Sequence, residues 1–115
     1  MSKSLKKEKK EQIKSTYFEF KGFLSFLILH EVSIKPLSGD ELAEKIGRRK
    51  GRILTAGTIY PTLKRLRLKK LIKYKRFGRR KVYSLTDIGR GELDNLYILF
   101  SRYFFGLKKF IKRPK

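Results

Sequence analysis

The apolar residues of this chain are grouped into segments whose spacing differs from one to the next. From Tyr17 to Val32 they go almost all the way round a helix, which predicts a first helix with more than one buried face. Pro36 ends that segment. The capping-box spacing of Ser38 and Glu41 then predicts a second helix, ending at Gly47. Its core-facing residues are expected to be Leu42, Ala43 and Ile46.

A third helix is predicted from a cap at Thr55 or Thr58 to about Leu68. At about 100° per residue, its apolar residues fall on one side and its basic or small residues on the other. The two sets are Ile59, Leu63 and Leu66 against Lys64, Arg65, Gly57 and Pro61. If Thr55 is the cap, Pro61 lies in the helix interior and a bend is expected there.

The segment from Leu71 to Leu85 predicts a β-hairpin. A two-residue turn that begins with Gly78, as a type II′ turn requires, sets the pairing of the two strands. The expected pairs are Ile72 with Leu85, Tyr74 with Tyr83, and Arg76 with Lys81. The base of the hairpin then packs on the helices, while its tip holds four basic residues in water: Arg76, Arg79, Arg80 and Lys81.

Thr86, followed by Asp87, opens a last helix that is predicted to continue to about Ile111. Its apolar residues follow one another at alternating spacings of four and three, which is a heptad pattern: Leu93, Tyr97, Phe100, Phe104, Leu107 and Ile111. The predicted fold is therefore mainly α with a small β-hairpin. It is a winged helix-turn-helix of three helices and a two-stranded wing at residues 16–86, followed by a long C-terminal dimerisation helix at residues 87–112. Residues 1–15 are read as a basic flexible arm and residues 113–115 as a tail.

Charge is distributed very unevenly along the chain. Of its net charge of +21, the stretch from Lys45 to Thr86 supplies sixteen Lys or Arg residues, with no Asp or Glu among them. A field of one sign over three consecutive elements steers and holds a polyanion. The alternative is a solvated charge run, but ordinary protein surfaces mix both signs.

Double-stranded DNA is the polyanion that this order of elements fits. The third helix has a basic side that can enter a major groove, the hairpin tip can reach the backbone or the minor groove, and a basic loop at 48–52 precedes them. Any single Lys here is more often a phosphate contact than a base reader. The predicted DNA-binding residues are Arg48, Arg49, Lys50, Arg52, Thr55, Thr58, Tyr60, Lys64, Arg65, Arg76, Arg79, Arg80 and Lys81.

Three segments resemble the PadR family of transcriptional regulators. Residues 57–66, GTIYPTLKRL, resemble the G-T-L-Y-P-x-L-x-x-L signature of that family's recognition helix. Residues 80–90, RKVYSLTDIGR, are similar to its R-K-x-Y-x-L-T-x-x-G-R, and residues 39–42, GDEL, stand where the family often has G-Y-E-L. The resemblance covers roughly residues 20 to 93. It implies a homodimeric repressor that binds a palindromic operator and dimerises through its C-terminal helix and often its first helix.

The chain departs from the family pattern at three places. Asp40 replaces the usual Tyr, which puts a ligand-linked role of that Tyr in doubt, and the wing tip is shorter than is common. Lys70 stands where a Gly normally turns the chain into the wing. A Lys with positive φ is unfavourable, so either a different turn or a strained residue is expected at this position.

The distribution of Phe supports a dimer independently of the resemblance. Eight of the nine Phe residues lie outside the basic stretch, in the first and last helices, and a core of this size cannot bury them all. The predicted dimer interface comprises Phe23, Phe26, Leu27, Leu93, Tyr97, Phe100, Phe104, Leu107 and Ile111. Two alternatives stay open: the last helix folds back on its own domain, or Tyr97, Tyr103 and Phe105 line a pocket for a small aromatic effector.

The sequence shows no catalytic constellation, so we expect a non-enzyme that uses no metal and no cofactor. There is no Cys, and the single His30 is expected to be structural, bonded to backbone or water. Neither a secretory signal nor a membrane span is apparent, which predicts a cytoplasmic, DNA-associated protein. The alternative function is a structural or nonspecific nucleic-acid-binding winged helix, either RNA- or ribosome-associated or chromatin-like. Membrane-surface binding is disfavoured because the basic stretch has no insertable apolar face.

Overall fold

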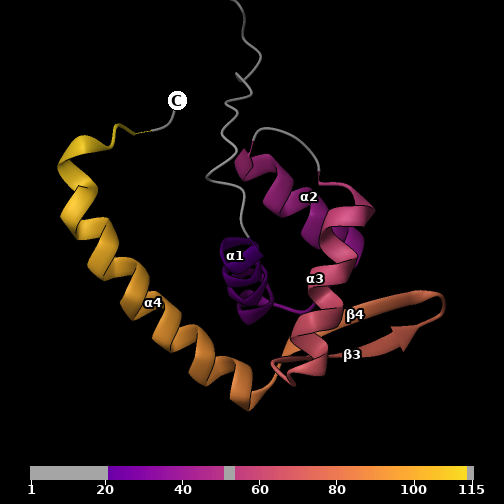
Figure 1. Cartoon of the computed structure of the whole chain (residues 1–115). Coiled ribbons are helices and arrows are strands. Elements are labelled where there is room, and N and C mark those ends of the chain that lie inside the picture. Colours follow the sequence, from indigo (N-terminus) through magenta and orange to yellow (C-terminus); the bar gives the residue numbers. More distant parts are fainter. Residues whose placement is uncertain (1–20, 51–53, 114–115) are drawn as a thin grey trace, which may run out of the picture.

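The computed structural model describes residues 21–50 and 54–113, which form a mainly helical fold with one small antiparallel sheet (Figure 1). The predicted fold class is confirmed. In chain order the elements are α1 (Lys21–Ile34), β2 (Leu37–Ser38), α2 (Gly39–Lys50), α3 (Ala56–Leu68), β3 (Ile72–Phe77), β4 (Arg80–Leu85), α4 (Asp87–Leu107) and the 3₁₀ segment η1 (Lys108–Phe110).

The core lies where α1 meets α2, α3, the sheet and the start of α4. In Figure 1, α1 is seen end-on between α4 on one side and the α2–α3 pair on the other. The predicted start of this helix at Tyr17 lies outside the described residues, and its observed end is Ile34, just before Pro36. The buried apolar residues are Ile28, Leu29, Val32, Leu37, Leu42, Ala43, Ile46, Leu54, Ile59, Leu63, Leu66, Ile72, Tyr83 and Leu93.

The sheet has three strands rather than the two expected, in the order β2-β4-β3. The extra strand, β2, pairs Leu37 with Tyr83 and Ser38 with Val82. A strand of two residues is too short to show an alternating pattern, so it could not be predicted from the order of residues. Its consequence is that the start of α2 is attached directly to the wing.

Helix α2 begins with the predicted capping box. The backbone N–H of Ser38 donates to Glu41 Oε1 at 2.8 Å, and the N–H of Glu41 donates to Ser38 Oγ at 3.2 Å. The predicted end at Gly47 is wrong, because the helix continues to Lys50 with Gly47 buried inside it. Arg48 and Arg49 are therefore helical residues that extend α2, and not part of a loop.

Helix α3 and the hairpin follow the sequence closely. Thr55 is the N-cap residue, which leaves Pro61 inside the helix, and Thr62 joins the predicted apolar stripe in the core. All three predicted strand pairs are present in the register. Gly78 has φ +64, and Arg79 is not among the residues of positive φ, which agrees with a type II′ turn. At Lys70, where either a different turn or a strained residue was expected, the strained residue is found, since Lys70 has φ +64.

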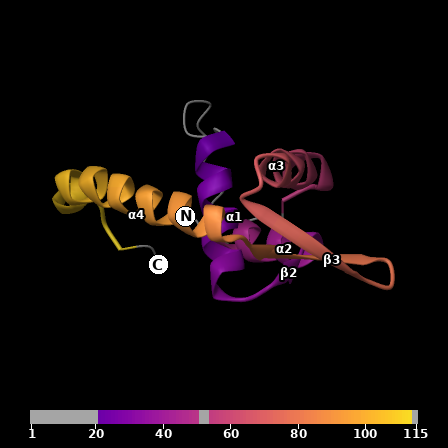
Figure 2. The ribbon, with the colours of Figure 1, turned by 90° about the horizontal axis from the view of Figure 1, so that it is seen from below.

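Helix α4 is capped by Thr86, whose hydroxyl accepts from the N–H of Gly89 at 2.9 Å. The helix ends at Leu107 and gives way to η1, so the prediction that it reaches Ile111 is wrong by about one turn. It packs on α1 as far as Phe100, whereas its C-terminal end stands clear of the rest of the molecule in both views (Figures 1 and 2). None of the helices in the described part of the chain combines the length and apolarity that crossing a membrane needs.

Candidate nucleic-acid interface

The outer side of α3 presents its basic residues to solvent. Lys64 is exposed and makes no ion pair within the described part of the chain. Arg65 is half-buried, and its Nη2 donates to Thr62 Oγ1 at 3.0 Å, which aligns the guanidinium along the helix. Lys64 is thus the cation of α3 that is most accessible to an anion.

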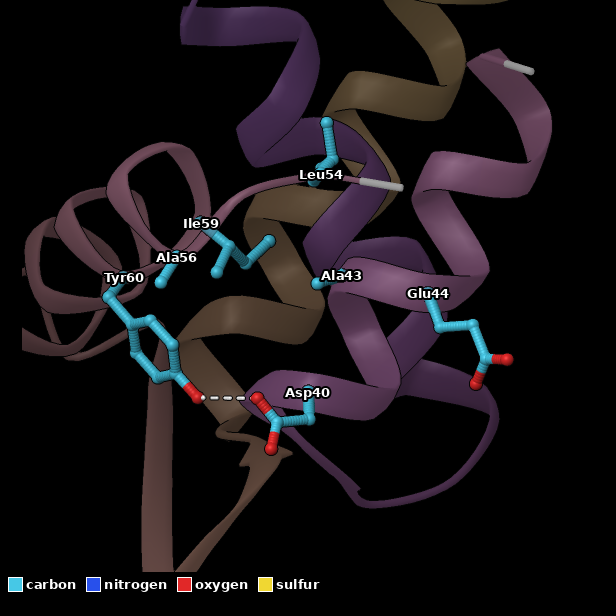
Figure 3. Close-up of a pocket in the computed structure, with 7 residues that line it drawn as sticks. All are labelled: Asp40, Ala43, Glu44, Leu54, Ala56, Ile59 and Tyr60. Carbon is cyan, nitrogen blue, oxygen red and sulfur yellow. Dashed lines mark hydrogen bonds between the residues drawn. The ribbon is translucent and has the colours of Figure 1, made fainter. Parts of the chain in front are cut away.

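The N-terminal turn of α3 carries three of the predicted DNA-binding residues. Thr55 and Thr58 are exposed, and their hydroxyl oxygens lie 3.1 Å apart. Tyr60 is 40% exposed, and its hydroxyl donates to Asp40 Oδ1 at 3.2 Å across the gap to α2 (Figure 3). Burial raises the pKa of the Tyr60 hydroxyl, and the bond to Asp40 raises it further. The phenol therefore stays protonated and remains a hydrogen-bond donor at neutral pH.

The basic end of α2 is engaged with carboxylates of the same chain. Arg48 pairs with Glu44 at 2.8 Å on the surface. Arg49 places both Nε and Nη2 on Glu31 Oε2, at 3.1 and 2.7 Å, and the Glu31 side chain is only 6% exposed. A buried carboxylate holds its partner firmly, so Arg49 joins α2 to α1. The Lys50 side chain and Arg52 lie outside the described residues.

The four basic residues of the wing differ in their surroundings. Arg76 and Arg79 are exposed, as predicted. The Lys81 ammonium lies 4.8 Å from the centre of the Tyr74 ring, which holds it by a cation–π contact. Arg80, although largely exposed, reaches back toward α2, where its Nη2 lies 3.1 Å from Ser38 Oγ and 3.3 Å from Glu41 Oε1. The expectation of four basic residues directed into water therefore holds best for Arg76 and Arg79.

Several residues near this surface were not singled out from the sequence. Lys73 and Lys75 are exposed on β3, on the face opposite Ile72 and Tyr74. Arg67 of α3 lies 5.7 Å from the Tyr74 ring centre. The alternation along β3 would have revealed the two lysines, because residues of one parity share a face. The contacts of Tyr60 and Arg80 with the start of α2 had no comparable signal.

The predicted dimer residues fall into two groups. Leu93 is fully buried in the core of its own chain, so it has no surface for a partner. Phe26 of α1 contacts the rings of Tyr97 and Phe100, with centres 5.7 and 5.6 Å apart. In the rest of the heptad seam, which is the series of apolar residues predicted from Leu93 to Ile111, Phe104 is half-buried. Leu107 at the end of α4 and Ile111 beyond η1 are 55% and 52% exposed. The alternative that α4 folds back on its own domain thus applies to the part of α4 up to Phe100.

The single histidine is bonded to a side chain, a partner that was not predicted. His30 Nδ1 lies 2.6 Å from the Tyr97 hydroxyl and ties α1 to α4. In residues 21–50 and 54–113, no three His, Asp or Glu side chains are grouped so that they could hold a metal ion. A hollow of about 320 Å³ lies between α2 and α3, lined by Asp40, Ala43, Glu44, Leu54, Ala56, Ile59 and Tyr60 (Figure 3).

A winged helix whose third helix has an exposed basic side is typical of DNA-binding regulators of transcription, and this is the class to which the fold and the surface point. The chain belongs to the PadR-like family of transcriptional regulators, because the model of that family matches residues 28–95, more than half of its length. No curated protein matches the chain.

Solved structures of similar chains support this assignment. A PadR family transcription regulator from Clostridium difficile R20291 is 28% identical with a TM-score of 0.68, and the match covers 79% of this chain and 100% of that one. A PadR-like transcriptional regulator from Bacillus cereus is 26% identical, with a TM-score of 0.70 and coverage of 82% and 96%. Bacillus subtilis PadR, solved in complex with operator DNA, is 28% identical with a TM-score of 0.58, and the match covers 66% of this chain and 47% of that one.

Proposed function

We propose that this chain is a sequence-specific repressor that binds a palindromic operator in double-stranded DNA as a homodimer. The observation that carries the proposal is the exposed basic side of α3, with Lys64 unpaired among the described residues and no acidic residue between Lys45 and Thr86. The similarity to Bacillus subtilis PadR, which was solved with operator DNA, supports it. We propose no catalytic role, and a regulator of this kind acts in the cytoplasm, where the chromosome is.

The exposed residues suggest a division of labour on DNA. An α-helix fits the major groove, so Tyr60 and Lys64 on α3 are placed to approach base edges. Arg76 and Arg79 at the wing tip are suited to the flanking backbone, and Arg48 at the end of α2 to a nearby phosphate. The proposed contacts to DNA thus come from both helices of the helix-turn-helix and from the wing.

The C-terminal end of α4 and the residues after it support the homodimer. Tyr103, Phe105 and Leu107 of α4, and Ile111 after η1, are all more than half exposed in the single chain. Large apolar side chains exposed together on one segment favour an interface. Phe23, Phe26 and Leu27 of α1 are only half-buried, which suits them to the edge of the same interface. A twofold dimer then presents two α3 helices to successive major grooves, and this fits a palindromic operator.

The experiment for DNA binding is a titration at several salt concentrations against three duplexes: a fragment of the protein's own promoter region, scrambled DNA, and RNA. A sequence-specific regulator should favour its promoter fragment by well over tenfold at physiological salt. A gain below about tenfold, or equal binding to the RNA duplex, favours the structural nucleic-acid-binding alternative.

The experiment for the dimer compares two exposed apolar residues on different sides of α4. Leu107→Asp lies on the seam, and Ile98→Asp serves as its control, since their side chains are 55% and 52% exposed. Sedimentation should show a dimer for the unchanged chain and for Ile98→Asp, and a monomer for Leu107→Asp. A dimer that survives Leu107→Asp contradicts an interface along this seam.

A further inference from the structure

The four residues Ser38–Glu41, which are the last residue of β2 and the first three of α2, contact both α3 and the wing. We propose that this segment, here called the α2 start, is a positioning site that fixes the recognition helix α3 relative to the wing and thereby determines discrimination between DNA sequences. The inference rests on the proposed function and adds residues that make no contact with DNA themselves.

The first attachment is to α3. The Tyr60 hydroxyl donates to Asp40 Oδ1 at 3.2 Å, and the Tyr60 ring lies over Gly39. A methyl group on Gly39 would come within 2.6 Å of the ring and its hydroxyl oxygen. Figure 3 shows the Tyr60 side chain extending from α3 to meet Asp40 in the first turn of α2. Gly39 and Asp40 together therefore set where this side chain of the recognition helix lies.

The second attachment is to the wing. Arg80 on β4 donates to Ser38 Oγ at 3.1 Å and pairs with Glu41 Oε1 at 3.3 Å. The backbone of Ser38 also pairs with Val82 on the same strand. The wing is thus joined to the α2 start by side chains and by the sheet, close to the turn at Gly78 and Arg79.

The α2 start is itself held rigidly. The Ser38 hydroxyl oxygen accepts from the Glu41 N–H and from Arg80, which uses both of its lone pairs. Glu41 Oε1 accepts from the Ser38 N–H at 2.8 Å. Ser38 is only 4% exposed. A segment whose polar groups bond to one another in this way can transmit a fixed geometry between the two elements attached to it.

Charge gives an independent reason to assign this role. A carboxylate beside a DNA-binding surface weakens the attraction to phosphate, and this cost needs a compensating function. Asp40 and Glu41 lie just before the acid-free stretch, and each is bonded to a side chain of a DNA-facing element, Tyr60 or Arg80. Phosphate contacts tolerate small displacements of the protein, whereas contacts to base edges depend on register. Loss of the attachment should therefore affect discrimination first.

The test measures the ratio of dissociation constants for scrambled DNA and for the promoter fragment that the unchanged chain prefers. Asp40→Ala and Glu41→Ala should each lower this ratio by about fivefold, the effect of one hydrogen bond of ordinary strength. Glu44→Ala is the matched control, because it removes the same charge from the same helix at an exposed position. Asp40→Asn should keep the ratio of the unchanged chain, since the amide oxygen of the new side chain still accepts a hydrogen bond from the Tyr60 hydroxyl.

The possible outcomes separate failure of the positioning role from failure of the proposed function. If Asp40→Ala and Glu41→Ala bind both duplexes as Glu44→Ala does, the α2 start has no positioning role, although the proposed function stands. If the unchanged chain shows no preference for its promoter fragment, the proposed function fails and this inference fails with it. Should Glu41→Ala unfold for lack of its cap, as circular dichroism would show, Asp40→Ala alone decides, because exposed Asp40 has no capping bond.

Discussion

Gly89 in the first turn of α4 packs against the carbonyl oxygen of Leu71, so closely that a methyl group at its Cα would overlap that oxygen. The same carbonyl accepts from the backbone N–H of Thr86 at 3.1 Å. The Thr86 hydroxyl is shared between the carbonyls of Lys70 and Leu71, at 2.6 and 3.0 Å. The end of α3, the start of β3 and the start of α4 are thereby joined at one point.

Gly89→Ala should destabilise the chain, although Ala is ordinarily the better helix residue. The added methyl meets the Leu71 backbone and lies 2.8 Å from Leu85 Cδ1, and backbone cannot move aside cheaply. Overpacking of this kind costs about 1 to 3 kcal/mol. Gly91→Ala is the control, since nothing lies within 4 Å of its added methyl, and it should stabilise by up to about 1 kcal/mol. Urea unfolding of both variants measures the difference, and equal stabilities would refute the close packing.

Lys70→Gly should stabilise the chain. Lys70 has φ +64, which costs a non-glycine residue about 1 to 2 kcal/mol, while the extra freedom of Gly in the unfolded state offsets part of the gain. A net increase of about 0.5 to 1 kcal/mol in the free energy of unfolding is expected. Lys69→Gly is the matched control, because Lys69 has φ −82 and gains no relief. The midpoint temperature of thermal unfolding should rise for Lys70→Gly and fall for Lys69→Gly. A fall for both variants would show that Lys70 is not strained.

Features set by neighbours in the sequence were predictable. Gly78 at the first position of a two-residue turn fixed the strand register, and the spacing of Ser38 and Glu41 located the start of α2. The replacement of a family Gly by Lys70 indicated either a different turn or a strained residue, and the second is observed. Each of these depends only on a few adjacent residues and on the backbone geometry that those residues prefer, so it can be predicted from a short stretch of sequence.

Features set by contacts between distant segments were not predictable. The continuation of α2 past Gly47 accompanies a bond between Arg49 and Glu31, 18 positions apart. In the sequence, Arg80 looks like an ordinary cation of the wing. In the fold, its Nη2 lies 3.1 Å from Oγ of Ser38, which is 42 positions away. The charge pattern predicted which elements carry the exposed cations, and α3 and the wing do present exposed basic residues. It did not separate cations that are open to DNA from cations that hold the fold together.

Arg49→Ala should destabilise the chain more than Arg48→Ala, although both remove an arginine from the last turn of α2. Without Arg49, the nearly buried Glu31 carboxylate loses two charge-assisted bonds, which costs about 1 to 3 kcal/mol. Arg48 is paired with Glu44 on the surface, where such pairs contribute at most about 1 kcal/mol. Chemical denaturation checks the ranking. If Arg48→Ala proves as costly, the Arg49–Glu31 bond does not anchor α2.

Stability should fall at acid pH partly through Glu41. The pKa of the Glu41 carboxyl is lowered in the folded chain, chiefly because it accepts a hydrogen bond from the Ser38 N–H. A lowered folded-state pKa gives a contribution that is present above the unfolded value of 4.5 and is lost as pH falls through the folded value. The stability difference between the unchanged chain and Glu41→Gln should therefore shrink as the pH falls from above 4.5 to well below it. A difference that is constant over this range would mean that Glu41 titrates alike in both states.

Arg79→Ala and Arg80→Ala should affect DNA binding in different ways, although the two residues are adjacent at the wing tip. Arg79 is exposed, so its loss should weaken binding to every duplex alike and reduce the slope of log affinity against log salt by about 0.9, the value for one phosphate contact. Arg80 is bonded to Ser38 and Glu41. Its loss should therefore lower the ratio of the dissociation constants for scrambled and promoter DNA, and should change the salt slope less than the loss of Arg79 does. Titrations of both variants at four salt concentrations separate the two effects. Equal losses of slope with unchanged ratios would mean that Arg80 leaves the α2 start on binding and contacts phosphate as Arg79 does.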